Sequence, residues 1–350
     1  MKKSLLLTFD YELFLGKSSG SVHECMITPT ELLRKVLSKH GVTAIFFVDT
    51  TYLLTGEKNA QLHEAARKDF EDVSNQVRAL IGDGHYVFPH IHPHWVDAEY
   101  HVESNEYTLN DISKYRFHNL TIAQRETIFN GSIRILKEII HPIKPGYEIN
   151  AYRAGGWSIQ PFEDFLPAFN TNNIKYDFSV MAGMYQYTKA QYFDFSNKVD
   201  KDIYRFGTDV LKEEKDGPFI EVSSNILQIP KQADLLHRIH QKYLWFIKKD
   251  YSYGKGIGQY EGNIKDIQPT SPEGKQHMHD RYEFFSLELL SIAKVGTYLN
   301  FFKENNYMHF VSHPKMLSEH NIDMLDRFVG KAKAKYEIET DFKKIIASTL

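Results

Sequence analysis

The sequence predicts a single α/β domain in which a barrel-like sheet of parallel strands is joined by helices. Short runs rich in β-branched and aromatic residues alternate with longer segments of helical periodicity, which is typical of parallel strands connected by helical crossovers. A chain of 350 residues is long enough for one barrel of roughly 250 residues with insertions. Apolar residues make up 42% of the chain and charged residues 25%, which favours a folded globular protein.

The expected strands are short runs of residues that favour extended backbone, as in strands buried within a parallel sheet. The first run, SLLLTF, begins close to the N-terminus, and the last, YMHFVS, lies more than 300 residues later. Seven such runs are found, at residues 4–9, 42–48, 85–90, 149–153, 176–180, 218–224 and 307–312.

The expected helices lie between these strands and after the last of them. Two begin behind a threonine, Thr28 and Thr121, and the first also has Pro29 in its opening turn, which is typical of helix starts. The predicted helices span residues 29–39, 60–82, 121–140, 160–170, 231–249, 281–305 and 320–337. Residues 95–120 and 251–280 break the alternation and are predicted to be insertions, either functional loops near a substrate or mobile segments.

Composition and charge argue against several classes of protein. The formal net charge of −3 with mixed signs provides no basic stripe, so no nucleic-acid partner is expected. Cys25 is the single cysteine, which excludes an intrachain disulfide or a thiolate metal cluster. No apolar run is long enough for a membrane span, and the N-terminus indicates a strand rather than a signal peptide. A cytoplasmic protein is therefore expected, while its oligomeric state is not predicted.

Polar residues that follow the apolar runs are the candidates for function, because the carboxyl ends of parallel strands carry the sites of such folds. The first strand leads into Asp10 and Glu12, which the two-residue period of extended chain turns to the same side. Two adjacent carboxylates repel each other unless a cation or a proton lies between them, which favours a metal or an acid/base role. A solvated loop with two incidental acids is the alternative.

Three histidines follow the third strand within five positions. They are His90, His92 and His94, and Pro93 between them argues against a helix. Imidazole is the commonest protein ligand of zinc-like ions, and two histidines with one carboxylate form a known catalytic set. The cluster therefore predicts a metal site.

Two further strand ends carry polar residues. Arg153 is followed by Gly155 and Gly156, whose small size permits close approach of the backbone to a ligand and whose N–H groups could stabilise an oxyanion. A tight strand-to-helix turn explains the glycines equally well, but not Arg153. His313 follows the last strand and adds a histidine to the same rim.

Taken together, the segments TFDYE, Gly84-His85 with the histidine cluster, RAGG and VSHP resemble, in order, the motifs of NodB-type polysaccharide deacetylases, carbohydrate esterase family 4. The resemblance extends from residue 4 to about 330 and implies a distorted (β/α)7 barrel. It differs from the family pattern in the acids of the first motif, which are usually adjacent aspartates, and in the two glycines of the third. It implies that His92 is a bystander or a group that supports the ligands from outside. It assigns the other roles as follows: Asp10 as catalytic base, Glu12, His90 and His94 as metal ligands, Arg153 as the group that orients the base, the N–H of Gly156 as oxyanion donor, and His313 as general acid.

The activity implied by this resemblance is metal-dependent hydrolysis of the N-acetyl group of a sugar, in the biosynthesis or modification of a surface polysaccharide. The cofactor would be a divalent ion, preferably zinc, and the partner an N-acetylated carbohydrate. Two alternatives remain open: a related metal-dependent C–N hydrolase acting on a small amide, and a non-catalytic sugar-binding protein of the same fold. A glycoside hydrolase is less favoured, because its two carboxylates need no histidine cluster.

Overall fold

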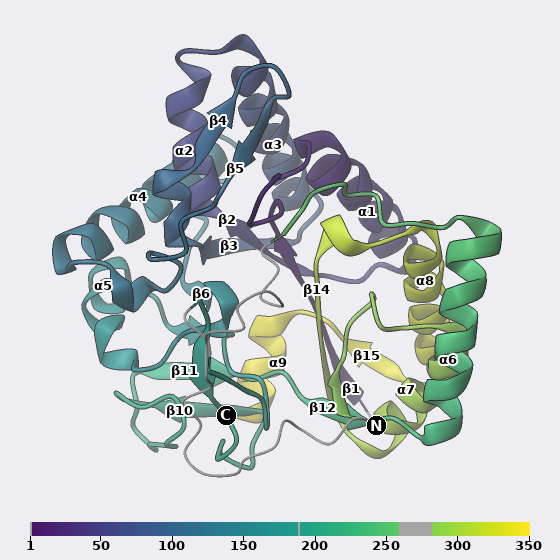
Figure 1. The fold of residues 1–350 in the computed structure, drawn as a ribbon. Coiled ribbons are helices and arrows are strands. Elements are labelled where there is room, and N and C mark those ends of the chain that lie inside the picture. The colour runs from purple at the N-terminus through teal and green to yellow at the C-terminus, as the bar shows by residue number, and fades with distance from the viewer. Residues whose placement is uncertain (1, 188–189, 259–281) are drawn as a thin grey trace.

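One curved sheet organises the protein, and its strand order confirms the predicted α/β architecture (Figure 1). The computed structural model describes residues 2–187, 190–258 and 282–350. All seven predicted strands are present in it: β1 (Lys2–Tyr11), β2 (Ile45–Asp49), β3 (Tyr86–Ile91), β6 (Ala151–Ala154), β7 (Tyr176–Asp177), β11 (Phe219–Val222) and β14 (Tyr307–Ser312). They pair in parallel in the order β11-β7-β6-β3-β2-β1-β14.

Two further strands join this sheet at its margins. The strand β10 (Ile203–Phe206) pairs antiparallel with β11, and β15 (Glu337–Glu339) pairs parallel with the start of β1. Side chains connect β14, at one end of the parallel order, to the chain after β11, at the other end. Tyr307 Oη donates to Ser223 O at 2.9 Å, and Asn225 Nδ2 donates to Tyr307 O at 3.1 Å. The barrel is distorted because, within the described residues, these side-chain hydrogen bonds, and not a ladder between strands, join the two ends.

The helices surround the sheet on its outer side, except for α9 (Phe342–Thr349), which lies within the ring of strands with Phe342 against Phe88 and Phe178 (Figure 1). They are α1 (Thr28–His40), α2 (Thr50–Ala60), α3 (Glu64–Gly82), α4 (Ile122–Ile140), α5 (Leu166–Asn172), α6 (Lys231–Tyr243), α7 (Ile292–Glu304), α8 (Glu319–Lys333) and α9. Short 3-10 or π segments are η1 (His23–Ile27), η2 (Pro93–Asp97), η3 (Phe117–Asn119), η4 (Gly155–Trp157), η5 (Phe162–Asp164), η6 (Leu244–Lys248) and η8 (Pro314–Met316). None of the helices in the described ranges is long and apolar enough to cross a bilayer.

Three helical predictions differ from the structure. The segment after β2 forms α2 directly, because Asp49 caps it by accepting from Tyr52 N–H, so the predicted helix at 60–82 is the second of two. The helix expected at 160–170 begins as the 3-10 turn η5 and becomes an α-helix only at Leu166, in α5. The helix expected at 281–305 begins at Ile292, because β13 (Tyr282–Phe284) pairs with β12 (Ile226–Gln228) instead.

The two predicted insertions are described to different extents. Residues 95–120 contain a hairpin of β4 (Glu99–His101) and β5 (Glu106–Thr108), and a second hairpin of β8 (Tyr185–Tyr187) and β9 (Tyr192–Asp194) lies elsewhere in the chain. Most of 251–280 falls outside the described residues. Its described beginning runs beside the chain after β14, where Gly254 N–H donates to Lys315 O at 3.2 Å.

A pair of fully buried carboxyl groups lies where β7 and β11 meet. Asp177 and Glu221 are partners in the strand register, and neither is exposed. Ser179 Oγ donates to Asp177 at 2.7 Å and Val180 N–H donates to Glu221 at 3.1 Å. Burial first, and then the neighbouring acid, raise the pKa of Glu221 well above its usual value, and burial also raises the pKa of Asp177. The raised pKa of Glu221 therefore means that the folded protein retains one proton on this pair above the ordinary carboxyl range.

We expect this pair to make stability depend on pH. The unfolded chain releases both protons near ordinary carboxyl pKa values, whereas the folded chain keeps one to higher pH, so the free energy of unfolding should fall as pH rises above the ordinary carboxyl range. Glu221→Gln keeps the acceptor for Val180 and cannot ionise, so its stability relative to wild type should increase between about pH 5 and about pH 8, by about 1.4 kcal/mol for each pH unit over which only the wild type loses a proton. Urea unfolding checks this, with exposed Glu163→Gln as the control. A pH-independent difference would contradict the retained proton.

Candidate functional site

A buried ion pair between Asp10 and Arg153 lies at the centre of the candidate site. Asp10 on β1 is 2% exposed and Arg153 on β6 is fully buried. Arg153 Nη1 donates to Asp10 Oδ1 at 2.5 Å. Burial alone would raise the pKa of Asp10, but Arg153 and, to a smaller degree, His90 hold that pKa below its ordinary value. Asp10 is therefore a carboxylate at neutral pH, with one oxygen fixed by the guanidinium group.

Further contacts hold Arg153 in one orientation. Nη2 donates to Thr8 Oγ1 at 2.8 Å, and Nε donates to Phe178 O at 3.1 Å. The guanidinium group also lies over the ring of Phe47, 4.2 Å from its centroid. Each of the three guanidinium nitrogens of Arg153 therefore has an acceptor, which allows the group to be buried.

His309, a strand residue that was not among the predicted site residues, contacts Arg153 from within β14. Its Nε2 lies 3.3 Å from Arg153 Nη2 and its Nδ1 lies 3.2 Å from Ser223 O. Burial and then the adjacent Arg153 lower the pKa of His309 to about 3. A neutral ring with its proton on Nδ1 satisfies both contacts, so His309 accepts from Arg153 and positions it.

Glu12, His90 and His92 form a buried cluster with the character of a metal site. One ligand atom from each lies within 4.8 Å of those of the other two. Glu12 Oε2 is 3.5 Å from His90 Nε2 and 3.2 Å from His92 Nδ1. His90 Nδ1 is 2.8 Å from the carbonyl oxygen of Arg153 and donates to it, so Nε2 is the ring nitrogen that faces Glu12. Burial would lower the pKa of His90, but the carboxylates of Asp10 and Glu12 raise it to about 9, so a cation bound at Nε2 would take the place of a proton.

The two oxygens of Glu12 have different surroundings. Oε1 accepts from Lys315 Nζ at 2.8 Å, and Lys315 also donates to Leu13 O at 2.7 Å. Oε2 is buried and has no hydrogen-bond donor among the described residues. Burial would raise the pKa of Glu12, but Lys315 and His92 outweigh it and hold this pKa well below its usual value. Oε2 is therefore an ionised oxygen that faces two imidazole nitrogens, an arrangement in which a cation could be held.

The motif resemblance assigned His94 as a ligand and His92 as a bystander, whereas the structure places His92, and not His94, in the group with Glu12 and His90. The backbone stays extended through His92, with φ −110° and ψ 90°, and then enters the η2 turn at Pro93. His90 and His92 therefore share one side of the extended chain, whereas the turn carries His94 away from Glu12. The ring of His94 stacks on Tyr115 with centroids 4.8 Å apart, and burial lowers its pKa to about 3.

Asp49 is a second carboxylate in contact with His92. It ends β2 and is fully buried, and its Oδ2 lies 3.2 Å from His92 Nδ1 and accepts from Trp95 Nε1 at 2.6 Å. Thr51 Oγ1 donates to the other oxygen at 2.7 Å. The same ring nitrogen of His92 therefore faces both Asp49 and Glu12, and Asp49 helps to fix the orientation of the ring.

His313, the predicted general acid, lies beside Asp10 and Glu12. Its Nε2 is 3.7 Å from Asp10 Oδ2 and 3.9 Å from Glu12 Oε1. Its Nδ1 is 3.1 Å from Glu288 Oε1, which also accepts from the His313 backbone N–H at 2.6 Å. Burial would lower the pKa of His313, but the hydrogen bond to Glu288 and the charge of Asp10 raise it. Glu288 therefore orients His313 and favours its protonated form.

The two glycines after β6 are required by close packing and backbone conformation. A Cβ at Gly155 would lie 2.3 Å from Ile91 O and 2.8 Å from a ring carbon of His92. Gly156 has φ +57°, in the left-handed region that favours glycine, and a Cβ there would lie 2.8 Å from the ring of Tyr115. The tight turn therefore explains both glycines, and the oxyanion role of the Gly156 N–H remains a prediction.

Sequence reasoning missed four polar residues of the site, namely Asp49, Glu288, His309 and Lys315. Asp49 ends an apolar run as Asp10 does, and Lys315 follows the VSHP motif directly, so the strand-end criterion could have selected both. Glu288 lies in a segment that was expected to be helical, and His309 lies inside a strand. Neither position carries a signal in a single sequence.

Fold and site together define an α/β protein with a distorted barrel and, at the carboxyl ends of its strands, a buried carboxylate and histidine site suited to a divalent cation. No family model and no curated protein sequence matches the chain.

Several solved structures are similar to the chain. One is a Mycobacterium smegmatis protein assigned as a polysaccharide deacetylase, with 13% sequence identity, a TM-score of 0.50 and coverage of 99% of this chain and 91% of that one. Another is the catalytic domain of a peptidoglycan N-acetylglucosamine deacetylase from Eubacterium rectale, with 14% identity, a TM-score of 0.36 and coverage of 97% and 89%. A third is a family 4 carbohydrate esterase from Streptomyces lividans, with 15% identity, a TM-score of 0.29 and coverage of 53% and 63%. At this level of identity, the first similarity shows a shared fold.

Proposed function

We propose that the protein is a metal-dependent hydrolase that removes the acetyl group from an N-acetylated sugar. The single observation that carries the proposal is the buried group of Glu12, His90 and His92 beside the ion pair of Asp10 and Arg153. The motif resemblance to NodB-type deacetylases supports it, as does the fold shared with a protein assigned as a polysaccharide deacetylase.

The residues of the cluster fit a divalent cation, preferably zinc. Glu12 Oε2 has no hydrogen-bond donor in the described part of the chain, and Nε2 of His90 faces it because Nδ1 is held by a backbone carbonyl. Asp10 pairs with Arg153 and Glu12 pairs with Lys315, whereas Asp49 and Glu288 lie against the imidazoles of His92 and His313. One carboxylate with two imidazoles is a set that suits zinc. When bound there, such an ion would polarise a carbonyl group and acidify a water molecule.

The protein's own residues supply the proton transfers. Asp10, kept ionised by Arg153, accepts the proton of the attacking water through its second oxygen, Oδ2. His313, held by Glu288, donates a proton to the departing amine, so that the C–N bond can break. The two groups are 3.7 Å apart across the site, which suits a base and an acid acting on one reacting centre. We further propose that the N–H of Gly156 stabilises the oxyanion.

Release of acetate tests this function directly. Purified protein loaded with zinc would be incubated with N-acetylhexosamine oligosaccharides, with a small N-acetyl amide, and with each after treatment with a chelator. Metal-dependent acetate release from the sugars supports the proposal, and release from the small amide alone would favour the related C–N hydrolase. Stoichiometric metal without hydrolysis of either substrate would favour a sugar-binding protein.

We expect His92→Ala to lose the metal and His94→Ala to retain it. His92 lies 3.2 Å from Glu12 Oε2, whereas His94 stacks on Tyr115. Removing one of three ligands should lower zinc affinity by at least about 100-fold, which is the upper end of the effect of losing an outer-shell partner. Elemental analysis of the two purified variants after dialysis at equal zinc concentration measures the difference. Loss of zinc from the His94→Ala variant alone would restore the assignment made from the sequence.

A further inference from the structure

The outer face of α6 and η6 carries an exposed apolar stripe. Three of its residues share one side of α6 and three follow one another in η6, and all are exposed by between 54%, at Trp245, and 74%, at Phe246. They are Leu235, Leu236, Ile239, Trp245, Phe246 and Ile247, and they are called the outer stripe below. A contiguous exposed apolar surface of this kind marks a binding surface in folded proteins.

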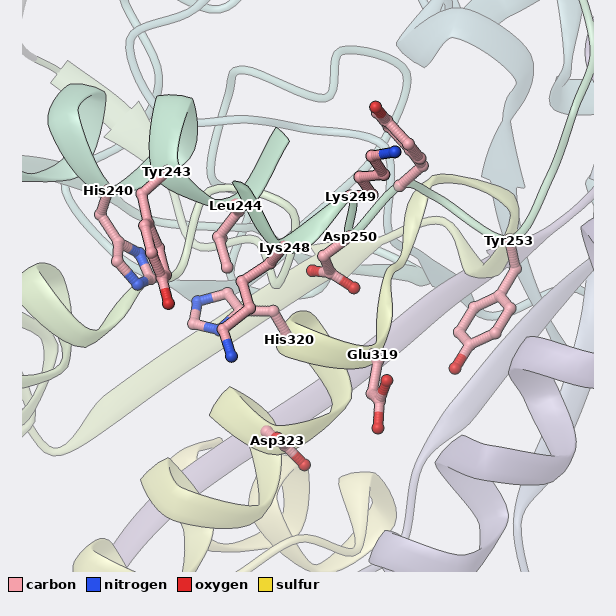
Figure 2. A pocket seen from close by; sticks show the side chains of 11 residues that line it. His240, Tyr243, Leu244, Lys248, Lys249, Asp250, Tyr253, Glu319, His320 and Asp323 are labelled. Atoms are coloured by element: carbon pink, nitrogen blue, oxygen red, sulfur yellow. The ribbon is translucent and has the colours of Figure 1, made fainter. Parts of the chain in front are cut away.

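The inner face of the same segment is more polar than the outer one. His237 Nδ1 lies 2.9 Å from Ser291 Oγ, and the ring of His240 lies 4.9 Å from that of His320 on α8. Figure 2 shows His240, Tyr243 and His320 around a pocket of about 550 Å³, with Asp250 nearby. Ala233 and Leu244 are the buried residues of the segment, so most of its large apolar side chains face solvent. This excess of exposed apolar surface indicates that the outer stripe has a partner.

The charges of the segment identify the chemistry of that partner. Residues 231–249 contain five lysines and arginines and a single aspartate, so their formal net charge is +4 although the whole chain has −3. All five cationic residues are exposed: Lys231, Arg238, Lys242, Lys248 and Lys249. An apolar stripe with lysine and arginine beside it, and with a tryptophan near one end, is the pattern of helices that lie in the surface of an anionic membrane.

We propose that α6 and η6 bind the protein peripherally to an anionic phospholipid membrane through the outer stripe. Together the two elements are 18 residues long and no membrane-spanning helix is found in the described ranges, so the segment would lie in the interface rather than cross it. The chain after η6 runs to the rim of the candidate site, where Tyr253 N–H donates to Leu317 O at 2.8 Å. Binding would hold that rim beside the lipid head groups.

A second copy of the chain is a weaker candidate for the partner. A two-fold symmetric dimer brings the same surface of both copies together, so the outer stripes would meet with five cationic residues on each side. Like charges at such an interface oppose association, whereas an anionic membrane attracts them.

Vesicle flotation tests the proposal, with vesicles of phosphatidylcholine alone and with about one quarter phosphatidylglycerol. The stripe variant combines Leu236→Gln, Ile239→Gln and Phe246→Gln. A control variant replaces three equally exposed apolar residues elsewhere, by Leu62→Gln, Val102→Gln and Ile122→Gln. A charge variant combines Arg238→Gln, Lys242→Gln and Lys248→Gln. Circular dichroism confirms that each variant is folded, and gel filtration gives its oligomeric state.

We expect the wild type and the control variant to float with the anionic vesicles. The partition coefficient of the stripe variant should be lower by at least about ten-fold, and the charge variant and raised salt should weaken binding to the anionic vesicles. Failure of the wild type to float with anionic vesicles, or equal flotation of the stripe variant, would overturn the proposal. A dimer that only the stripe variant loses, without vesicle binding, would overturn it in favour of a second copy.

Discussion

Replacing Asp10 with asparagine is expected to lower kcat/KM for acetate release by about 10³-fold while the zinc content stays unchanged. The expected loss is that of a general base in the transition state. Asparagine keeps the size of the side chain and an acceptor for Arg153, so the fold should be preserved. Steady-state kinetics and elemental analysis on the same preparation separate the two effects.

The exposed Asp216→Asn serves as the matched control for this substitution and should have wild-type activity. Equal loss of zinc and activity from the Asp10→Asn variant would make Asp10 a metal ligand. It would then exchange the roles proposed for Asp10 and Glu12.

The second large effect is expected on stability, from Arg153→Met. Arg153 is fully buried and donates to Asp10, Thr8 and a backbone carbonyl, so its removal leaves the Asp10 carboxylate buried without its cation. Loss of one partner of a buried ion pair typically costs about 3 to 5 kcal/mol in the free energy of unfolding. Urea unfolding of the wild type and the variant, both without added metal, measures this cost.

A double-mutant cycle shows whether the unpaired carboxylate is the cause. Adding Asp10→Asn to the Arg153→Met variant removes the uncompensated charge, so part of the lost stability should return. A cost of Arg153→Met below about 1 kcal/mol, or no recovery in the double variant, would show that the ion pair does not organise the core of the site.

The strands were predictable because each is an apolar run of residues that favour extended backbone, bounded by polar turns. Helix boundaries were less predictable where tertiary contacts decide them. The side chain of Asp49 caps α2 and so creates a helix that periodicity alone did not separate from α3. Pairing of β13 with β12 takes residues 282–284 out of the expected helix. These contacts join segments that are distant in sequence and have no local signature.

Much of the candidate site was predictable because parallel strands end on the same rim. Asp10, Arg153 and His313 were selected as strand-end residues, and the structure brings them within contact distance. His94 was predicted as a ligand from the spacing of the family motif, whereas the backbone conformation places His92 beside Glu12. The chain remains extended to His92 and turns at Pro93, so the two-residue period relates His90 to His92. Glu288 and His309 reach the site only through tertiary folding.

Anomalous diffraction from crystals grown with zinc tests the central claim most directly. The account predicts one strong peak at the zinc edge within about 2.0–2.2 Å of Glu12 Oε2, His90 Nε2 and a ring nitrogen of His92. Asp10 and His313 should flank this peak without replacing any of the three ligands. A peak bound by His94 in place of His92, or no peak among these residues at saturating zinc, would contradict the account.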